Sequence, residues 1–157
     1  MAKKLEEEVE LLRRIPIFAK IEPARLKLLA FTSERVTYEP GQELCHQGDI
    51  GDAAYLVISG EANILVDTPA GPLKIAEVSK NALVGEIAII NDVPRTATVQ
   101  ARTRVEALRI TKDHFLRLVA EFPQIAIEIM RVLATRLSRT NEELTDARRK
   151  LAAPAQT

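Results

Sequence analysis

The sequence predicts a mainly β fold flanked by helices, with about eight antiparallel strands between N-terminal helices and a long C-terminal helix. Two observations support this prediction. In residues 35–110, short runs of β-branched and apolar residues alternate with glycine and proline, which is typical of an antiparallel sandwich or barrel. On both sides, apolar residues recur at helical spacing. We therefore divide the chain, as one domain, into N-terminal helices (1–34), a β region (35–110), C-terminal helices (111–151) and a tail (152–157).

Composition is that of a globular protein. The 157 residues suit one domain, and 46% are hydrophobic and 28% charged. Because 22 basic residues balance 22 acidic residues, no overall field draws the chain to nucleic acid or to an anionic membrane. The single cysteine, Cys45, excludes an intramolecular disulfide, and the N-terminus lacks a signal-peptide pattern, which favours the cytoplasm. No apolar run is long enough to span a membrane.

Two amphipathic helices are expected in the N-terminal segment. The first covers residues 3–14 and ends before Pro16, since proline interrupts a helix. The second begins near Pro23, because proline is tolerated in the first turn. Their apolar faces consist of Leu5, Val9 and Leu12 in the first helix and of Leu26, Leu29 and Ala30 in the second.

Four strands of the β region can be assigned directly. They cover residues 55–58, 62–66, 73–78 and 105–110. Glycines fall between the runs, where tight turns favour positive φ angles.

Helical periodicity returns after residue 110. Thr111 is a suitable N-cap for a helix with Phe115, Leu118 and Val119 on its apolar face, and Pro123 interrupts this pattern. A long final helix follows, with small or apolar residues at alternating spacings of four and three. They are Ala126, Met130, Leu133, Leu137, Thr140, Leu144, Ala147 and Leu151. This heptad seam predicts a homodimer through the helix, with the alternative that residues 126–137 pack on the β region.

The segment 82–99 contains residues that are suited to binding an anion. Gly85 precedes a short helical pattern, so backbone N–H groups and the positive end of a helix dipole can face an anion there. Arg95 follows Pro94, and its paired donors suit a phosphate. Taken singly, Glu86 and Arg95 are also what a solvated surface would carry.

Together these residues resemble a known motif. Gly85-Glu86-Ile87-Ala88, followed by Pro94-Arg95-Thr96-Ala97-Thr98-Val99, resembles the phosphate-binding cassette of cyclic nucleotide-binding domains, here at residues 84–99. Residues 11–66 are similar to the sensor half of the catabolite activator protein group, and the resemblance extends over residues 11–144. It implies an eight-stranded antiparallel β-roll, or jelly roll, that senses a cyclic nucleotide. One departure is Val84, where the family commonly has an aromatic residue.

The resemblance also implies roles for individual residues. Arg95 would neutralise the cyclic phosphate, and Glu86 would accept a hydrogen bond from the ribose 2′-hydroxyl, which suits an ionised carboxylate. Gly85 and Ala88 would supply close backbone approach and N–H groups, while Thr96 would contact the phosphate or base. The implied ligand-binding set is Gly85, Glu86, Ile87, Ala88, Arg95, Thr96, Thr140 and Asn141.

Thr140 and Asn141 are placed by the resemblance where the long helix can reach the base. The alternative is that Thr140 is a small seam residue and that Asn141 is exposed. An amide pairs with either purine, so these residues do not decide the ligand, and cAMP is favoured over cGMP because adenine is the commoner base in bacterial members. If the helix contacts both the base and a partner, ligand binding would shift its position.

Several classes are disfavoured. The chain ends soon after the long helix, where the catabolite activator group continues into a helix-turn-helix, so sequence-specific DNA binding is not expected. Basic residues of the final helix are accompanied by acidic ones and indicate a solvated face; they are Arg131, Arg136, Arg139, Arg148, Arg149 and Lys150. His46 and His114 have no histidine neighbour, so we expect neither a metal site nor an enzyme, and no cofactor beyond the cyclic nucleotide ligand.

Two questions stay open at this point. A β-roll that has lost its ligand would serve as a protein-interaction domain, although the presence of both Glu86 and Arg95 argues against this. The effector protein is unknown, and the chain is either a separate protein or a piece of a larger one.

Overall fold

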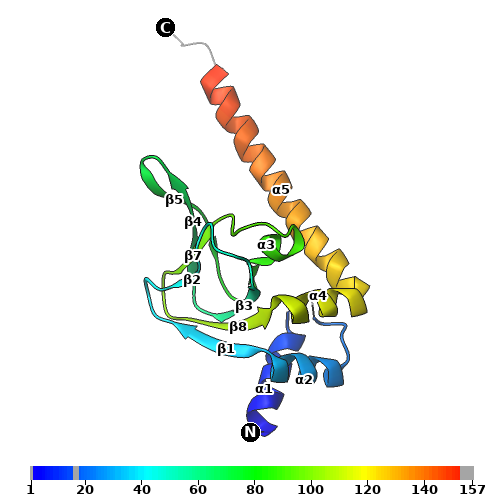
Figure 1. The fold of residues 1–157 in the computed structure, drawn as a ribbon. Coiled ribbons are helices and arrows are strands. Elements are labelled where there is room, and N and C mark those ends of the chain that lie inside the picture. The colour runs from blue at the N-terminus through cyan, green and yellow to red at the C-terminus, as the bar shows by residue number, and fades with distance from the viewer. Residues whose placement is uncertain (1, 16–17, 153–157) are drawn as a thin grey trace.

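The β region folds into two four-stranded antiparallel sheets (Figure 1). The computed structural model describes residues 2–15 and 18–152. The strands are β1 (Glu34–Tyr38), β2 (Glu43–Cys45), β3 (Ala53–Ser59), β4 (Ala62–Thr68), β5 (Gly71–Val78), β6 (Leu83–Val84), β7 (Thr98–Ala101) and β8 (Val105–Thr111). One sheet has the order β1-β8-β3-β6 and the other β2-β7-β4-β5. The expected eight-stranded β-roll with flanking helices is confirmed.

Helices precede the sheets, interrupt them once and follow them. They are α1 (Ala2–Arg13), α2 (Pro23–Thr32), α3 (Glu86–Ile90), α4 (Lys112–Glu121) and α5 (Pro123–Ala152). Thr111 caps α4, since its hydroxyl accepts a hydrogen bond from the backbone N–H of His114 at 3.5 Å. Pro123 is the first residue of α5, where a missing N–H costs least. Pro16 and the tail beyond Ala152 lie outside the described residues.

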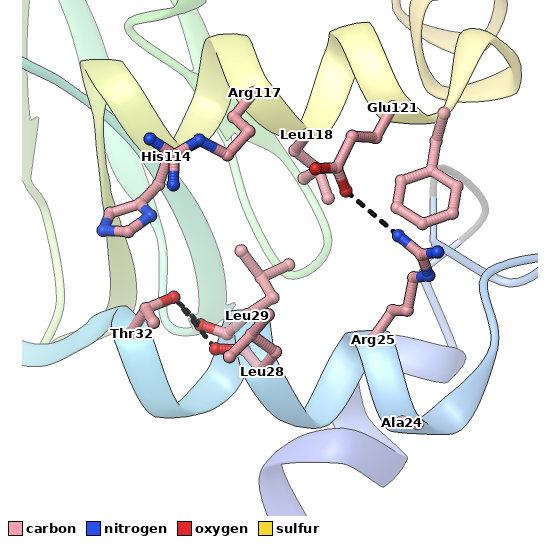
Figure 2. Close-up of a pocket in the computed structure, with 10 residues that line it drawn as sticks. Ala24, Arg25, Leu28, Leu29, Thr32, His114, Arg117, Leu118 and Glu121 are labelled. Carbon is pink, nitrogen blue, oxygen red and sulfur yellow. Dashed lines mark hydrogen bonds and ion pairs between the residues drawn. The ribbon is translucent and has the colours of Figure 1, made fainter.

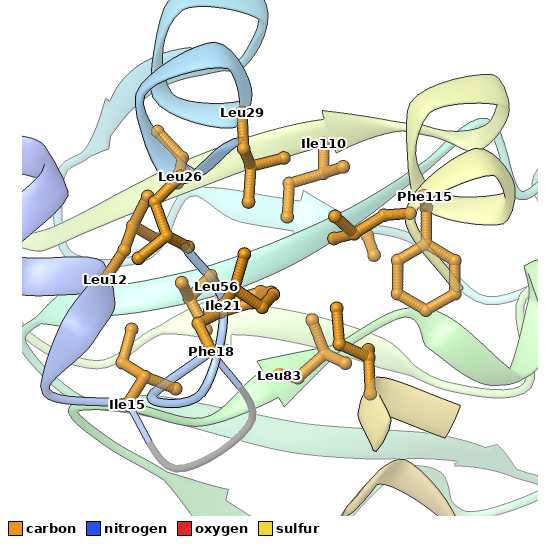
Figure 3. Close-up of a cluster of buried hydrophobic side chains, with 14 of the residues drawn as sticks. Leu12, Ile15, Phe18, Ile21, Leu26, Leu29, Leu56, Leu83, Ile110 and Phe115 are labelled. Carbon is orange, nitrogen blue, oxygen red and sulfur yellow. The ribbon is translucent and has the colours of Figure 1, made fainter. Parts of the chain in front are cut away.

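The sheet that contains β3 is buried on both faces. Leu56 on β3 packs with Leu108 in a cluster that the helices cover, whereas Tyr55 and Val57 pack between the two sheets. This alternation is the two-residue period of a strand. In Figure 3, side chains from the N-terminal segment, such as Leu12 and those of α2, meet side chains of β3 and β8. The N-terminal helices are thereby fixed to the sheet that carries the candidate site.

The long helix α5 contacts its own domain through its N-terminal half. Ile125 and Ile129 are buried, and Leu133 packs partly against the same cluster. The seam residues Met130, Leu137, Leu144 and Leu151 are 65%, 62%, 49% and 87% exposed. The helix therefore packs on the domain through a stripe that includes the seam residue Leu133, and Figure 1 shows its C-terminal half extending away from the sheets.

Among the described residues, no helix is both long enough and apolar enough to cross a membrane.

Candidate functional site

Gly85 begins the cassette in a conformation that favours glycine. It lies between β6 and α3 with a φ of +83° and is the N-cap of α3. A Cβ added here would lie 2.5 Å from Nη1 of Arg95. The absence of a side chain therefore permits both the left-handed turn and the close approach of the arginine.

Arg95 is buried, with 4% of its surface exposed. Its Nη1 donates to the carbonyl oxygen of Gly85 at 2.9 Å, and its Nη2 donates to that of Ala53 at 2.7 Å. The carboxylate of Asp52 lies 3.5 Å from Nη2, and the guanidinium lies 5.9 Å from the ring centroid of Tyr55. Because a guanidinium has five N–H donors, this arrangement leaves further donors for an anion. Burial excludes the simple surface interpretation of Arg95.

The backbone of Arg95 is held from the opposite side by the loop between β2 and β3. The N–H of Gly48 donates to the carbonyl of Arg95 at 2.9 Å, and the N–H of Arg95 donates to the carbonyl of Asp49 at 2.8 Å. This loop belongs to the segment on which the family resemblance was based. Its part in the site is to fix the arginine backbone.

Glu86 is also buried, with 3% exposed surface, at the start of α3. Its Oε1 accepts a hydrogen bond from Nη1 of Arg136 at 2.8 Å, and Nη2 of Arg136 donates to the carbonyl of Leu83 at 3.2 Å. Burial raises the pKa of the Glu86 carboxyl, while its own backbone N–H, Arg136 and Arg95 act in the opposite direction. A ligand hydroxyl that donates to the carboxylate would stabilise its charged form.

Arg136 belongs to the candidate site, although the sequence pattern does not single it out. The pattern places it with the basic residues of a solvated helix face, but it reaches the cassette from α5 and its side chain is 39% exposed. A signal was present in the periodicity. The buried residues Ile125 and Ile129 define a stripe with i, i+4 spacing, and Arg136 continues it at i+7 from Ile129.

The other predicted residues lie in two places. Ala88 is buried, Ile87 is half-buried, and Thr96 is exposed beside Arg95 in the chain. Thr140 and Asn141 are exposed on α5, beyond Arg136, and the hydroxyl of Thr140 donates to the Arg136 carbonyl at 2.9 Å. The structure thus brings together the cassette residues and Arg136, and it leaves Thr140 and Asn141 outside this contact.

A cavity of about 370 Å³ adjoins the Glu86–Arg136 pair. Its wall is formed by the β5–β6 turn, Leu83 and the α5 residues Ile129 and Val132. The volume falls in the range of small-molecule sites. Arg95 does not line it, so an anion held by that guanidinium would lie outside this cavity.

A family model matches the part of the chain that contains the cassette. The model described as "Cyclic nucleotide-binding domain" matches residues 35–122, which is more than half of the chain.

Individual relatives extend this similarity. The chain is 32% identical over 138 residues to a "CRP-like cAMP-activated global transcriptional regulator" of Mycobacterium tuberculosis, covering 87% of this chain and 62% of the relative. The Thermus thermophilus catabolite activator protein superposes with a TM-score of 0.73 at 28% identity, covering 83% of this chain and 62% of that structure. The fold is also shared by the regulatory subunit of a "cAMP-independent protein kinase A" from Trypanosoma brucei, with a TM-score of 0.74, 21% identity, and coverage of 85% and 48%. The chain therefore spans less than two thirds of the length of these relatives.

Proposed function

The chain belongs to the family of cyclic nucleotide-binding domains, and we therefore propose that it is a regulatory sensor that binds a cyclic nucleotide, cAMP in preference to cGMP. One observation carries the proposal. Gly85 lets the buried guanidinium of Arg95 approach the turn that presents the buried carboxylate of Glu86. A singly charged phosphodiester next to a ribose hydroxyl matches this pair of a cation and a carboxylate.

The preference for cAMP is supported by the similarity to a relative described as cAMP-activated. A kinase subunit of the same fold is described as cAMP-independent, so the base must be tested directly. Thr140 and Asn141 are the proposed base contacts, Thr96 is a proposed phosphate or base contact, and all three residues are exposed.

Calorimetric titration of the purified chain with cAMP, cGMP and 5′-AMP tests the proposal. Saturable binding of a cyclic nucleotide, with 5′-AMP much weaker, is the expected result, because Arg95 offers one cation to one phosphodiester charge. Heat from neither cyclic nucleotide would instead support a β-roll that has lost its ligand and binds proteins.

Ligand occupancy is proposed to reach α5 through Arg136. This side chain joins α5 to the Glu86 carboxylate, which is the proposed acceptor for the ribose hydroxyl. A ligand hydroxyl that donates to Oε1 competes with Arg136 for this oxygen, so the ligand has different affinities for the two conformations in which α5 keeps or loses the contact. That difference is the requirement for a population shift.

Substitution of Arg136 with leucine is expected to remove this coupling. The distance between the sheets and α5 is measured by pulsed electron paramagnetic resonance between spin labels at positions 104 and 150. Cys45→Ser removes the native cysteine so that only these two positions are labelled. We expect cAMP to shift this distance in the parent chain and to leave it nearly unchanged in Arg136→Leu, because the substitution removes the side chain that joins α5 to Glu86.

Arg139→Leu is the matched control, since Arg139 is exposed on the same helix and its loss should leave the shift intact. An equal shift in Arg136→Leu at saturating cAMP would contradict transmission through this residue.

We further propose that the exposed seam of α5 pairs with a second copy to form a parallel homodimer. In heptad terms Met130, Leu137, Leu144 and Leu151 share one core position, and Glu143 and Arg148 flank the seam at g and e positions. In a parallel pair Glu143 would face the partner subunit's Arg148, so the charges are complementary.

Leu137→Glu and Leu144→Glu are expected to dissociate this dimer. Each change places a charge in the seam and removes burial worth about 2 to 5 kcal/mol, so the dimer should weaken by at least about 30-fold. Sedimentation measures the change, and Leu116→Glu, which alters an exposed leucine on α4, is the control. A chain that is monomeric before any substitution would refute the dimer.

The remaining parts of the proposal concern enzymatic activity, cellular compartment and the effector protein. We propose a non-enzymatic module that acts in the cytoplasm through an effector protein still to be identified. The relatives that match the chain are regulatory proteins, which supports the first part.

A further inference from the structure

A groove of about 360 Å³ lies between α2 and α4 (Figure 2), and none of its lining residues belongs to the cassette at residues 84–99. The two helices run antiparallel across it. Arg25 on α2 faces Glu121 on α4, with Nη1 and Oε2 3.1 Å apart, and seven residues away on each helix Thr32 and His114 form the other end. The groove therefore has two ends of different character.

The middle of the groove is apolar, and one end is closed. Leu28 and Leu29 line it from α2, and Leu118 lines it from α4. Beyond them the Arg25–Glu121 ion pair crosses the groove, and the Arg25 guanidinium lies 5.1 Å from the ring centroid of Phe122. This bridge blocks a peptide helix from lying along the groove, but it leaves room for a chain that enters from the opposite end.

The open end carries positive charge. Figure 2 shows Arg117 and His114 turned toward this end, near Thr32. Within residues 18–152 and 5–15, whose side chains are described, no carboxylate lies within ion-pair distance of Arg117. The guanidinium is always charged, so it can accept an anionic group without displacing another partner.

We propose that this groove is a second ligand site, which binds a medium-chain monocarboxylate of the fatty-acid class. The alkyl chain lies against Leu28, Leu29 and Leu118, and the carboxylate pairs with Arg117 beside the His114 imidazole. Charge complementarity at the open end and closure at the Arg25–Glu121 end select this occupant over a cationic or a helical one. The site is independent of the proposed cyclic nucleotide function.

A chain-length series tests the apolar part of the site. The full chain is titrated with hexanoate, octanoate and decanoate below their micelle concentrations and followed by calorimetry and amide NMR shifts. One-to-one binding should tighten by up to about fourfold for each buried methylene, with shifts centred on residues 25–32 and 114–122. Decylammonium should bind far more weakly than decanoate. Absence of saturable decanoate binding, or equal binding of decylammonium, would overturn the proposal.

Three substitutions distinguish the contact with the carboxylate from the contact with the alkyl chain. Arg117→Glu should weaken every carboxylate by about 10- to 100-fold, the effect of losing a charged hydrogen bond. Leu28→Ser, at a residue 64% exposed and thus tolerant, should reduce the gain per methylene instead. Lys27→Glu makes the same change in charge on α2 outside the groove and should leave binding unchanged. If Arg117→Glu and Lys27→Glu behave alike, the carboxylate does not bind at the proposed place.

Discussion

Arg95→Ala is expected to weaken cyclic nucleotide binding by about 2 to 5 kcal/mol, because the substitution leaves a buried phosphate charge without its partner. By calorimetry this corresponds to a loss of roughly 30- to 5,000-fold in affinity. The effect is large because the guanidinium is 4% exposed. Little water can reach this position, so the phosphate charge is poorly solvated once the guanidinium is removed.

Two further variants show whether the loss is specific. Arg95→Lys keeps a charge but cannot donate in the same fork to Gly85, Ala53 and a phosphate, so intermediate affinity is expected. Arg109→Ala is the matched control, since Arg109 also contacts Asp52, at 3.0 Å, but makes no hydrogen bond or ion pair with residues 84–99. Thermal unfolding of each variant separates lost binding from lost folding. Unchanged affinity in a folded Arg95→Ala protein would refute the assigned role.

Gly60→Ala is expected to destabilise the fold by about 2 to 5 kcal/mol, combining a left-handed backbone penalty with overpacking. Gly60 lies in the turn between β3 and β4 with a φ of +91°. An added Cβ would lie 2.1 Å from the carbonyl oxygen of Arg104 and 2.9 Å from Cα of Val105. Both neighbours are backbone atoms at the start of β8, so they cannot move without disturbing the strand pairing.

Gly41→Ala provides the comparison for this prediction. Gly41 has almost the same φ, +92°, but an added Cβ would meet no atom within 4 Å. Its substitution should therefore cost only the conformational penalty of about 1 to 2 kcal/mol. Denaturant unfolding measures both variants, and an equal loss of stability would contradict the importance of the close approach at Gly60.

Elements with strong local patterns were predictable from sequence. The alternation at residues 73–78 lies within β5, and Thr111 and Pro123 mark the starts of α4 and α5 as the sequence indicates. Strand β6 has two residues, and only its pairing with Tyr55 and Leu56 of β3 makes it a strand. Such a segment carries no periodicity of its own, so the sequence indicates β structure before Gly85 but not the bounds of the strand.

The candidate site likewise has a part that the sequence predicts and a part that it does not. Gly85, Glu86 and Arg95 are close in sequence, so their spacing could be recognised before their burial was known. Arg136 is 50 residues from Glu86, and Arg131 and Arg139 on the same helix are chemically equivalent to it in the sequence. Only the rotation of α5 about its axis, fixed by the burial of Ile125 and Ile129, determines which arginine reaches the carboxylate.

The way α5 is attached also makes it a mechanical lever. The helix has 30 residues and is about 45 Å long at 1.5 Å per residue. Its last contact with the cassette is at Arg136, about 10 Å beyond the buried Ile129, and an arm of about 24 Å extends past Arg136. A rotation of about 10° centred on Ile129 moves Arg136 by about 2 Å and the far end of the helix by roughly 6 Å, about the rise of one helical turn. In the proposed coupling, the length of the free arm amplifies a small rearrangement at Glu86 into a displacement that an effector protein could recognise.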